Sequence, residues 1–383
     1  MPPIYLDNAA TTPVDPRVAD AVRPLLAEEF GNPSSRHPPG VRAAEALDLA
    51  RRRVARALGA DPERVTFTSG GTEANNLAVL GLARAARSEG RHVLVGATEH
   101  ASVRASALAL RDEGFEVEFL RLDAAGDLDE EDLARRLRPD TVLVSQMRAN
   151  NEFGTVFPVA RVARAVRARS PVARLHADCV QGLGKLECSP ADLGVDCISV
   201  SGHKVHGPKG VGALVFAEAR PLRPLTFGGG QEDARRPGTE NLPGIVGFGV
   251  ACELAEERRE QAVAAMAACR AALLERIAGI AGLQPFEPGS ERLPSILALR
   301  VAWAPAEVVM HHLEVHGVYV SSGSACQARN AQASPAALAL GLTSHDAKRM
   351  LRISFSGSST PEQARLAGEA LEAVGRELQA VAR

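Results

Sequence analysis

Residues 197–210 read Cys-Ile-Ser-Val-Ser-Gly-His-Lys-Val-His-Gly-Pro-Lys-Gly. The short apolar run at the start of this stretch is typical of a buried strand. Lys204 follows the strand and stands among a hydroxyl, an imidazole and glycines, which let a backbone turn closely around a ligand. The chain contains four lysines, and Lys204 is the one that phosphate-binding side chains flank. The stretch therefore predicts a strand that ends at a reactive lysine.

An aspartate precedes this stretch, in the segment Leu-His-Ala-Asp at residues 175–178. A lysine that forms an imine and an acid that keeps a pyridine nitrogen protonated are the protein groups that pyridoxal 5'-phosphate needs. Lys204 and Asp178 together predict a site for this cofactor, with Gln181 as a candidate donor to the ring hydroxyl. A glycine-flanked lysine alone is more often a loop residue, so the prediction depends on the other residues of the predicted site.

Short apolar runs alternate with longer segments of helical spacing. The predicted strands are residues 65–68, 92–95, 117–120, 142–145 and 197–200, and the predicted helices include residues 75–88, 102–113 and 159–168. This order predicts an α/β fold with a mainly parallel sheet, whose ligands bind at the carboxyl ends of the strands. After about Val250 the pattern changes to a long helix at 247–278 and then to shorter elements. We expect a large domain at 12–255 and a smaller domain formed by 1–11 and 256–383.

Three polar segments lie where predicted strands end. Residues 68–76 read Thr-Ser-Gly-Gly-Thr-Glu-Ala-Asn-Asn, so the N–H groups of a helix start and the Thr72 hydroxyl could bind an anion. A glycine turn with a threonine cap is the simpler alternative. His100 follows residues 92–95, where its imidazole could stack on a pyridine ring. Asn150 and Asn151 follow residues 142–145, and turn chemistry also explains asparagine there.

Composition excludes several classes of function. The 383 residues include 44 basic and 46 acidic side chains, and a net charge of -2 gives no reason to expect a nucleic-acid surface or a polybasic membrane patch. No uncharged apolar run is long enough to span a bilayer, and the first residues do not resemble a signal peptide, so we expect a cytoplasmic protein. The six cysteines show no paired CxxC spacing, so neither a disulfide framework nor a metal site is indicated.

Six ordered segments resemble the cysteine desulfurases, a group of class-V aminotransferases among the fold-type I pyridoxal phosphate enzymes. The segments are residues 5–12, 31–37, 68–76, 150–152, 201–212 and 321–326. The resemblance runs from end to end of the chain. It implies a mainly parallel seven-stranded sheet flanked by helices, with a smaller α+β domain that carries the cysteine of the last segment.

The resemblance also implies roles for individual residues. Lys204 would form the internal aldimine with the cofactor, and His100 would stack on its ring. Asp178 would contact the pyridine nitrogen, and Gln181 the ring oxygen. The other implied cofactor-binding residues are Gly71, Thr72, Asn151, Ser201 and His203, with Thr239 reaching the phosphate of a neighbouring subunit. A homodimer with shared sites follows from that last role.

Cys326 distinguishes this group from ordinary aminotransferases. It stands among small and polar residues at 322–330, where a thiolate would be accessible for attack. Arg352 matches the arginine that binds the substrate carboxylate, with Asn151 as its partner. The implied reaction takes sulfur from L-cysteine and gives L-alanine and a persulfide on Cys326, from which sulfur passes to an acceptor protein such as an iron–sulfur scaffold.

The acceptor and two other functions stay open at this point. Residues 327–334 are unusual for the group, and an iron–sulfur scaffold, a carrier for tRNA thiolation and a dedicated pathway protein are all compatible acceptors. A selenocysteine lyase or β-lyase of the same fold would not require Cys326. A non-catalytic sulfur-relay or scaffold subunit would not require Lys204, Asp178, His100 and Cys326 together.

Overall fold

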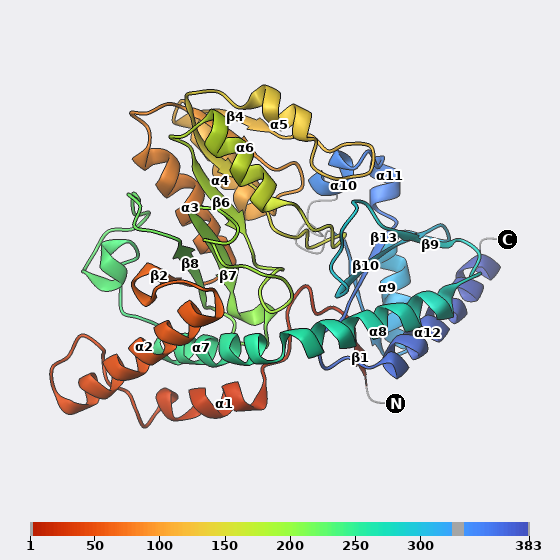
Figure 1. The fold of residues 1–383 in the computed structure, drawn as a ribbon. Coiled ribbons are helices and arrows are strands. Elements are labelled where there is room, and N and C mark those ends of the chain that lie inside the picture. Colours follow the sequence, from red (N-terminus) through yellow and green to blue (C-terminus); the bar gives the residue numbers. More distant parts are fainter. Residues whose placement is uncertain (1–2, 324–332, 382–383) are drawn as a thin grey trace.

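The computed structural model describes residues 3–323 and 333–381. Figure 1 shows two adjoining parts, of which the larger contains a seven-stranded sheet with helices on its faces. The smaller part contains a four-stranded sheet and two long helices, α8 (Arg259–Ile277) and α12 (Pro361–Val381), which lie side by side. The two parts meet where α8 follows α7 (Leu242–Glu257).

The large sheet has the strand order β2-β8-β7-β6-β5-β3-β4. Its strands are β2 (Val65–Thr68), β3 (His92–Val95), β4 (Glu116–Phe119), β5 (Thr141–Ser145), β6 (Arg174–Asp178), β7 (Cys197–Ser201) and β8 (Gly212–Phe216). β8 is antiparallel to β2 and β7, and all other pairs are parallel. The predicted α/β fold with a mainly parallel seven-stranded sheet is therefore confirmed.

Helices between the strands cover this sheet. They include α3 (Gly71–Ala85), α4 (Ala101–Asp112), α5 (Glu130–Arg136) and α6 (Val159–Arg169), and α1 (Pro16–Val22) and α2 (Pro38–Ala57) pack on α7. α3 begins at Gly71 and not at residue 75 as predicted. Its cap, Gly70, has a φ of 149°, which glycine tolerates, so the helix starts directly at the turn. The predicted anion-binding segment is thus the first turn of α3.

The single long helix predicted at 247–278 is wrong. Two helices, α7 and α8, meet at Arg258, whose φ of -108° and ψ of 4° leave the helical region. The Arg258 N–H bonds to Leu254 O and Glu256 O, and its guanidinium reaches Asp15, 3.2 Å away. The sequence around Arg258 favours helix throughout, so local propensity does not predict this break. The contact of Arg258 with Asp15, which is distant in sequence, accompanies it.

The smaller part is built around the second sheet, with the order β12-β13-β10-β9 and antiparallel pairs. Its strands are β9 (Leu283–Phe286), β10 (Ile296–Val301), β12 (Ser321–Ser322) and β13 (Met350–Ser354). β1 (Ile4–Tyr5) pairs with β11 (Val318–Tyr319), so the start of the chain joins this part. The remaining helices are α9 (Ala306–Val315), α10 (Pro335–Ala339) and α11 (Ser344–Ala347), and short 3-10 turns occur at η1 (Arg23–Leu26), η2 (Pro62–Arg64), η3 (Gly202–Lys204) and η4 (Gln231–Ala234).

Two large hydrophobic cores correspond to these parts. One draws buried residues from Val18 to Cys252, and the other combines Ile4 and Leu6 with residues between Met266 and Val374. The separation supports the division into 12–255 and 1–11 with 256–383, which stays a proposal. Within residues 3–323 and 333–381, no helix is long and apolar enough to cross a membrane, and no cluster of His, Cys, Asp or Glu is arranged for a metal ion.

Candidate active site

A cavity of about 300 Å³ lies at the carboxyl ends of the central parallel strands. Asp178 is the last residue of β6, and Ser201 is the last residue of β7. Ten of the residues predicted from the sequence line this cavity, which we call the site cavity: Gly71, Thr72, His100, Asn151, Asp178, Gln181, Ser201, His203, Lys204 and Arg352. The structure thus brings together residues from six separate segments of the chain.

Two predicted residues do not line the site cavity. Thr239 is exposed on the segment after η4 and does not border the site cavity. Cys326 lies outside the described residues. Gly323 and Pro335, on either side of the segment that contains Cys326, both line the cavity.

Asp178 is buried at the base of the site cavity and accepts hydrogen bonds on both carboxylate oxygens. Asn75 Nδ2 donates to Oδ2 at 2.7 Å, and the backbone N–H of Val180 donates to Oδ1 at 2.9 Å. Hydrogen bonds to a buried carboxylate hold its orientation and compensate its lost hydration. No role for Asn75 was predicted from the sequence, although it lies one helical turn after Thr72.

His100 caps α4 and is held by the first turn of that helix. Its Nδ1 accepts from the backbone N–H of Ser102 at 3.2 Å and lies 2.8 Å from Ser102 Oγ. Because Nδ1 is the acceptor, the proton of the neutral ring is on Nε2. The ring borders the site cavity in an orientation set by the helix.

A recess for an anion lies beside the site cavity, between the start of α3 and the end of β7. Its lining includes Gly70, Gly71, Thr72, Ser201 and His203. Ser201 Oγ is buried without a hydrogen-bond partner among the described residues, an arrangement that costs free energy unless a ligand satisfies it. A Cβ on Gly71 would lie 2.8 Å from Val180 Cγ2, so a larger residue at position 71 would require the Val180 side chain to move. These groups fit a phosphate at a helix N-terminus.

Lys204 reaches the site cavity from η3. Its Nζ donates to the carbonyls of Ala9 and Ala10, each at 2.6 Å, and Gln181 Nε2 donates to Ala9 O at 3.1 Å. Burial, and then the charges of Lys204 and Lys209, lower the pKa of His203 to about 4, so His203 is neutral at pH 7. The start of the chain is thus part of the wall around the lysine.

Arg352 is 3% exposed and comes from β13 in the smaller part. Its Nη2 lies 2.7 Å from Asp7 Oδ1, and Nη1 donates to the backbone carbonyl of Asn151 at 2.9 Å. The predicted association of Arg352 with Asn151 therefore occurs through the main chain. Arg352 Nε is buried with no hydrogen-bond partner among the described residues.

Two acids at the site cavity were not predicted as site residues. Burial, and then the charge of Asp178, raise the pKa of Glu99 well above its usual range. Burial raises the pKa of Glu152 to about 7, and Ser334 Oγ donates to Glu152 Oε1 at 2.8 Å. Each acid is the direct neighbour of a predicted residue, because Glu99 precedes His100 and Glu152 follows Asn151. This adjacency was the signal in the sequence that could have identified the two acids.

Comparison with known proteins gives the family. A model of the aminotransferase class-V family matches residues 4–366. The chain belongs to this family. This class-V aminotransferase is 37% identical to the cysteine desulfurase IscS of Dictyoglomus turgidum, over 99% of this chain and 96% of the relative. It is 41% identical to the cysteine desulfurase IscS of Anaeromyxobacter sp. strain Fw109-5, over 94% of this chain and 89% of the relative. The resemblance to cysteine desulfurases is confirmed.

Solved structures agree with this assignment. A NifS-like protein superposes with a TM-score of 0.91 at 34% identity, covering 98% of this chain and 99% of that protein. SspA, solved in complex with cysteine, has a TM-score of 0.81 at 33% identity and covers 92% of this chain and 98% of its own. DndA from Streptomyces lividans has a TM-score of 0.76 at 39% identity, with coverages of 92% and 99%. The fold-type I architecture is therefore confirmed for this class-V aminotransferase.

Proposed function

We propose that this class-V aminotransferase is a pyridoxal phosphate-dependent cysteine desulfurase, which converts L-cysteine to L-alanine and retains the sulfur as a persulfide on Cys326. The observation that carries the proposal is the convergence of ten predicted residues on one cavity. Support comes also from 37% identity to a cysteine desulfurase over 99% of the chain. SspA binds cysteine in its solved structure, which favours cysteine as the substrate here.

The cofactor would be held at both of its ends by side chains with suitable chemistry. Ser201, Thr72 and the first N–H groups of α3 would bind the phosphate, and Asp178 would pair with the pyridine nitrogen. Lys204 would provide the amine for the covalent link. When bound, pyridoxal phosphate withdraws electrons from the α-carbon of an attached amino acid. Asp178 supports this withdrawal because Asn75 and Val180 hold its carboxylate in place.

Arg352 would orient the substrate. Its Nε has no hydrogen-bond partner in the described part of the chain. A guanidinium binds a carboxylate through directed N–H groups. Lys204 Nζ would then move the proton at the α-carbon, since Lys204 is the one lysine among the residues that line the site cavity. His100 would hold the plane of the ring through its fixed imidazole.

Sulfur transfer completes the proposed reaction. The Cys326 thiolate attacks the sulfur of the substrate, a new S–S bond forms, and the electron pair of the broken C–S bond stays with the carbon fragment. Protonation of that fragment gives alanine. A homodimer in which Thr239 contacts the phosphate of the other subunit, a sulfur-acceptor protein such as an iron–sulfur scaffold and a cytoplasmic location are also part of this proposal.

The test is product analysis of the purified holoenzyme with L-cysteine and a reducing thiol. Equal yields of alanine and sulfide are expected. Pyruvate with ammonia would indicate a β-lyase, and activity that persists in Cys326→Ala would favour a selenocysteine lyase or β-lyase. Absence of product, together with absence of a bound yellow cofactor, would favour the scaffold function.

A further inference from the structure

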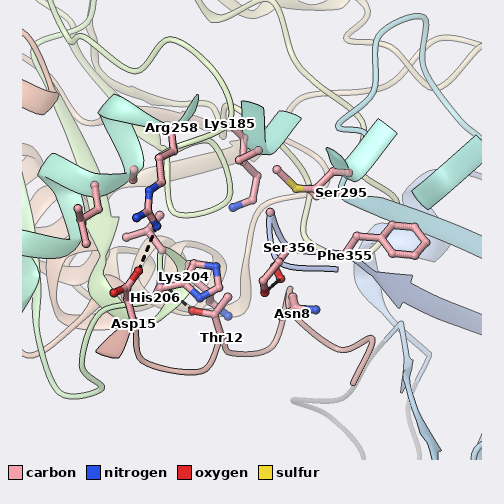
Figure 2. Close-up of a pocket in the computed structure, with 18 of the residues that line it drawn as sticks. Asn8, Thr12, Asp15, Lys185, Lys204, His206, Arg258, Ser295, Phe355 and Ser356 are labelled. Carbon is pink, nitrogen blue, oxygen red and sulfur yellow. Dashed lines mark hydrogen bonds and ion pairs between the residues drawn. The ribbon is translucent and has the colours of Figure 1, made fainter. Parts of the chain in front are cut away.

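A second cavity, of about 590 Å³, adjoins the site cavity and has no role in the proposed function. The two cavities share Ala9, Gln181 and Lys204 as lining residues. Leu183 on one wall belongs to the first hydrophobic core, and Met266 and Phe355 on the opposite wall belong to the second. Figure 2 shows this second cavity with side chains from both parts of the molecule around it.

Lys185 extends into the second cavity (Figure 2). Its Nζ makes no hydrogen bond or ion pair with any residue in 3–323 or 333–381. Burial lowers the pKa of this amine to about 8, so it is still largely charged at pH 7. A half-buried ammonium without a partner is costly and calls for an anion. Lys185 is also one of only four lysines in a chain with forty arginines.

A second polar group in this cavity also lacks a partner. Ser295 is 2% exposed and lines the cavity, and its Oγ has no hydrogen-bond partner among the described residues. Buried hydroxyls are normally satisfied by protein or by a bound molecule. Ser295 precedes β10 and belongs to the smaller part, whereas Lys185 belongs to the larger part. A ligand that met both groups would therefore bridge the two parts.

The lining of the second cavity carries more positive than negative charge. Arg258 pairs with Asp15 at 3.2 Å, and Asp15, which also pairs with Arg17, is the one acid among the lining residues of this cavity. Lys204 Nζ donates to two backbone carbonyls, and His206 donates from Nδ1 to Pro13 O at 2.9 Å. Of the cationic groups at the cavity, Lys185 alone has no hydrogen bond or ion pair within the described part of the chain, so it is the group that an anionic ligand would meet.

We propose that the second cavity binds a small organic carboxylate, with its carboxylate at Lys185 and Ser295 and its apolar body against Leu254, Met266 and Phe355. The volume is in the range of small-molecule sites. A phosphate ester would leave the apolar wall unused. An amino acid would bring its ammonium close to Lys185 and Arg258, so neither substrate nor product is the expected ligand. The inference does not rest on the proposed function.

The test is binding of hexanoate to the holoenzyme, measured by calorimetry and ligand-detected NMR. Hexanoate is expected to bind at least tenfold more tightly than hexan-1-ol, which has the same chain without the charge, and inorganic phosphate is expected not to compete. Lys185→Met should weaken hexanoate binding at least tenfold. Lys348→Met, at an exposed lysine of the smaller part, should leave binding unchanged.

Three outcomes would overturn the proposal. One is the absence of saturable hexanoate binding to the wild-type holoenzyme. Another is equal hexanoate affinity of wild type and Lys185→Met. If that variant does not fold, equal affinity of the wild type for hexanoate and hexan-1-ol would overturn the proposal instead. The third is loss of hexanoate binding in Arg352→Gln with retention in Lys185→Met, because the carboxylate would then occupy the site cavity.

Discussion

Asn75 donates a hydrogen bond of 2.7 Å from Nδ2 to Oδ2 of Asp178. Its Nδ2 also lies 2.9 Å from Ser102 Oγ, the hydroxyl that contacts His100. One amide on α3 thus connects the acid at the end of β6 with the imidazole at the start of α4. The two side chains proposed to hold the cofactor ring from its edge and its face are therefore positioned by a shared, buried network.

Asn75→Ala should weaken cofactor binding by about 10- to 100-fold, because removal of a hydrogen bond to a buried charge leaves Asp178 poorly oriented. Titration of the apoprotein with pyridoxal phosphate, followed by absorbance, measures this effect. Asn76→Ala is the matched control, since Asn76 Nδ2 donates to Thr72 O within its own helix. Equal affinities of the two variants would contradict the role of Asn75.

Ser201→Ala should have opposite effects on the empty and the loaded protein. The apoprotein should be as stable as wild type or more stable by up to about 1 kcal/mol, because a buried hydroxyl without a partner is removed. Cofactor affinity should fall by about tenfold or more with the loss of a phosphate donor. Thermal denaturation of the apoprotein and cofactor titration measure the two effects, and a destabilised apoprotein with normal affinity would show that Ser201 is merely structural.

Binding of L-alanine to the holoenzyme should depend on Glu152. With a pKa of about 7, Glu152 is neutral below that pH and ionised above it. The ionised carboxylate competes with the ligand carboxylate for Arg352, so wild-type affinity relative to Glu152→Gln should fall by about threefold to tenfold as pH rises from about 6 to about 8. Titration of L-alanine itself affects both proteins equally, so it cancels in the ratio of the two affinities. A ratio that is independent of pH would exclude this role.

Two substitutions separate the cofactor step from sulfur transfer. Cys326→Ser should keep the absorbance of the bound cofactor and lose persulfide formation, because the attacking thiolate is absent. Lys204→Ala should lose the absorbance of the lysine-linked cofactor, because no amine is left to form the link. Absorbance spectra and a persulfide assay after incubation with L-cysteine distinguish them. Normal turnover by either variant would refute the role assigned to that residue.

The sequence predicted most of the sheet because its strands are short apolar runs between polar turns. Residues 65–68 and 92–95 became β2 and β3 with the predicted bounds. The break at Arg258 and the pairing of Arg352 with Asp7 depend instead on contacts between residues far apart in the chain. Local propensity and spacing do not contain such contacts.

The site showed the same contrast. Residues next to glycines and strand ends, such as Lys204 and Asp178, could be chosen from the sequence. Asn75, Glu99 and Glu152 act through burial and through neighbours from other segments, so their position beside predicted residues was the one signal that the sequence contained. Their roles became visible when the elements were placed around one cavity.

The carbonyls of Ala9 and Ala10 hold the Lys204 ammonium, and the Ala9 N–H donates to Ser354 Oγ at 2.9 Å. A segment that is translated before the large sheet is therefore fixed by a strand, β13, that is translated after it. A nascent chain that has emerged only as far as the large sheet lacks both Arg352 and the anchor of its N-terminal segment. Catalytic competence would accordingly arise only after β13 has been translated.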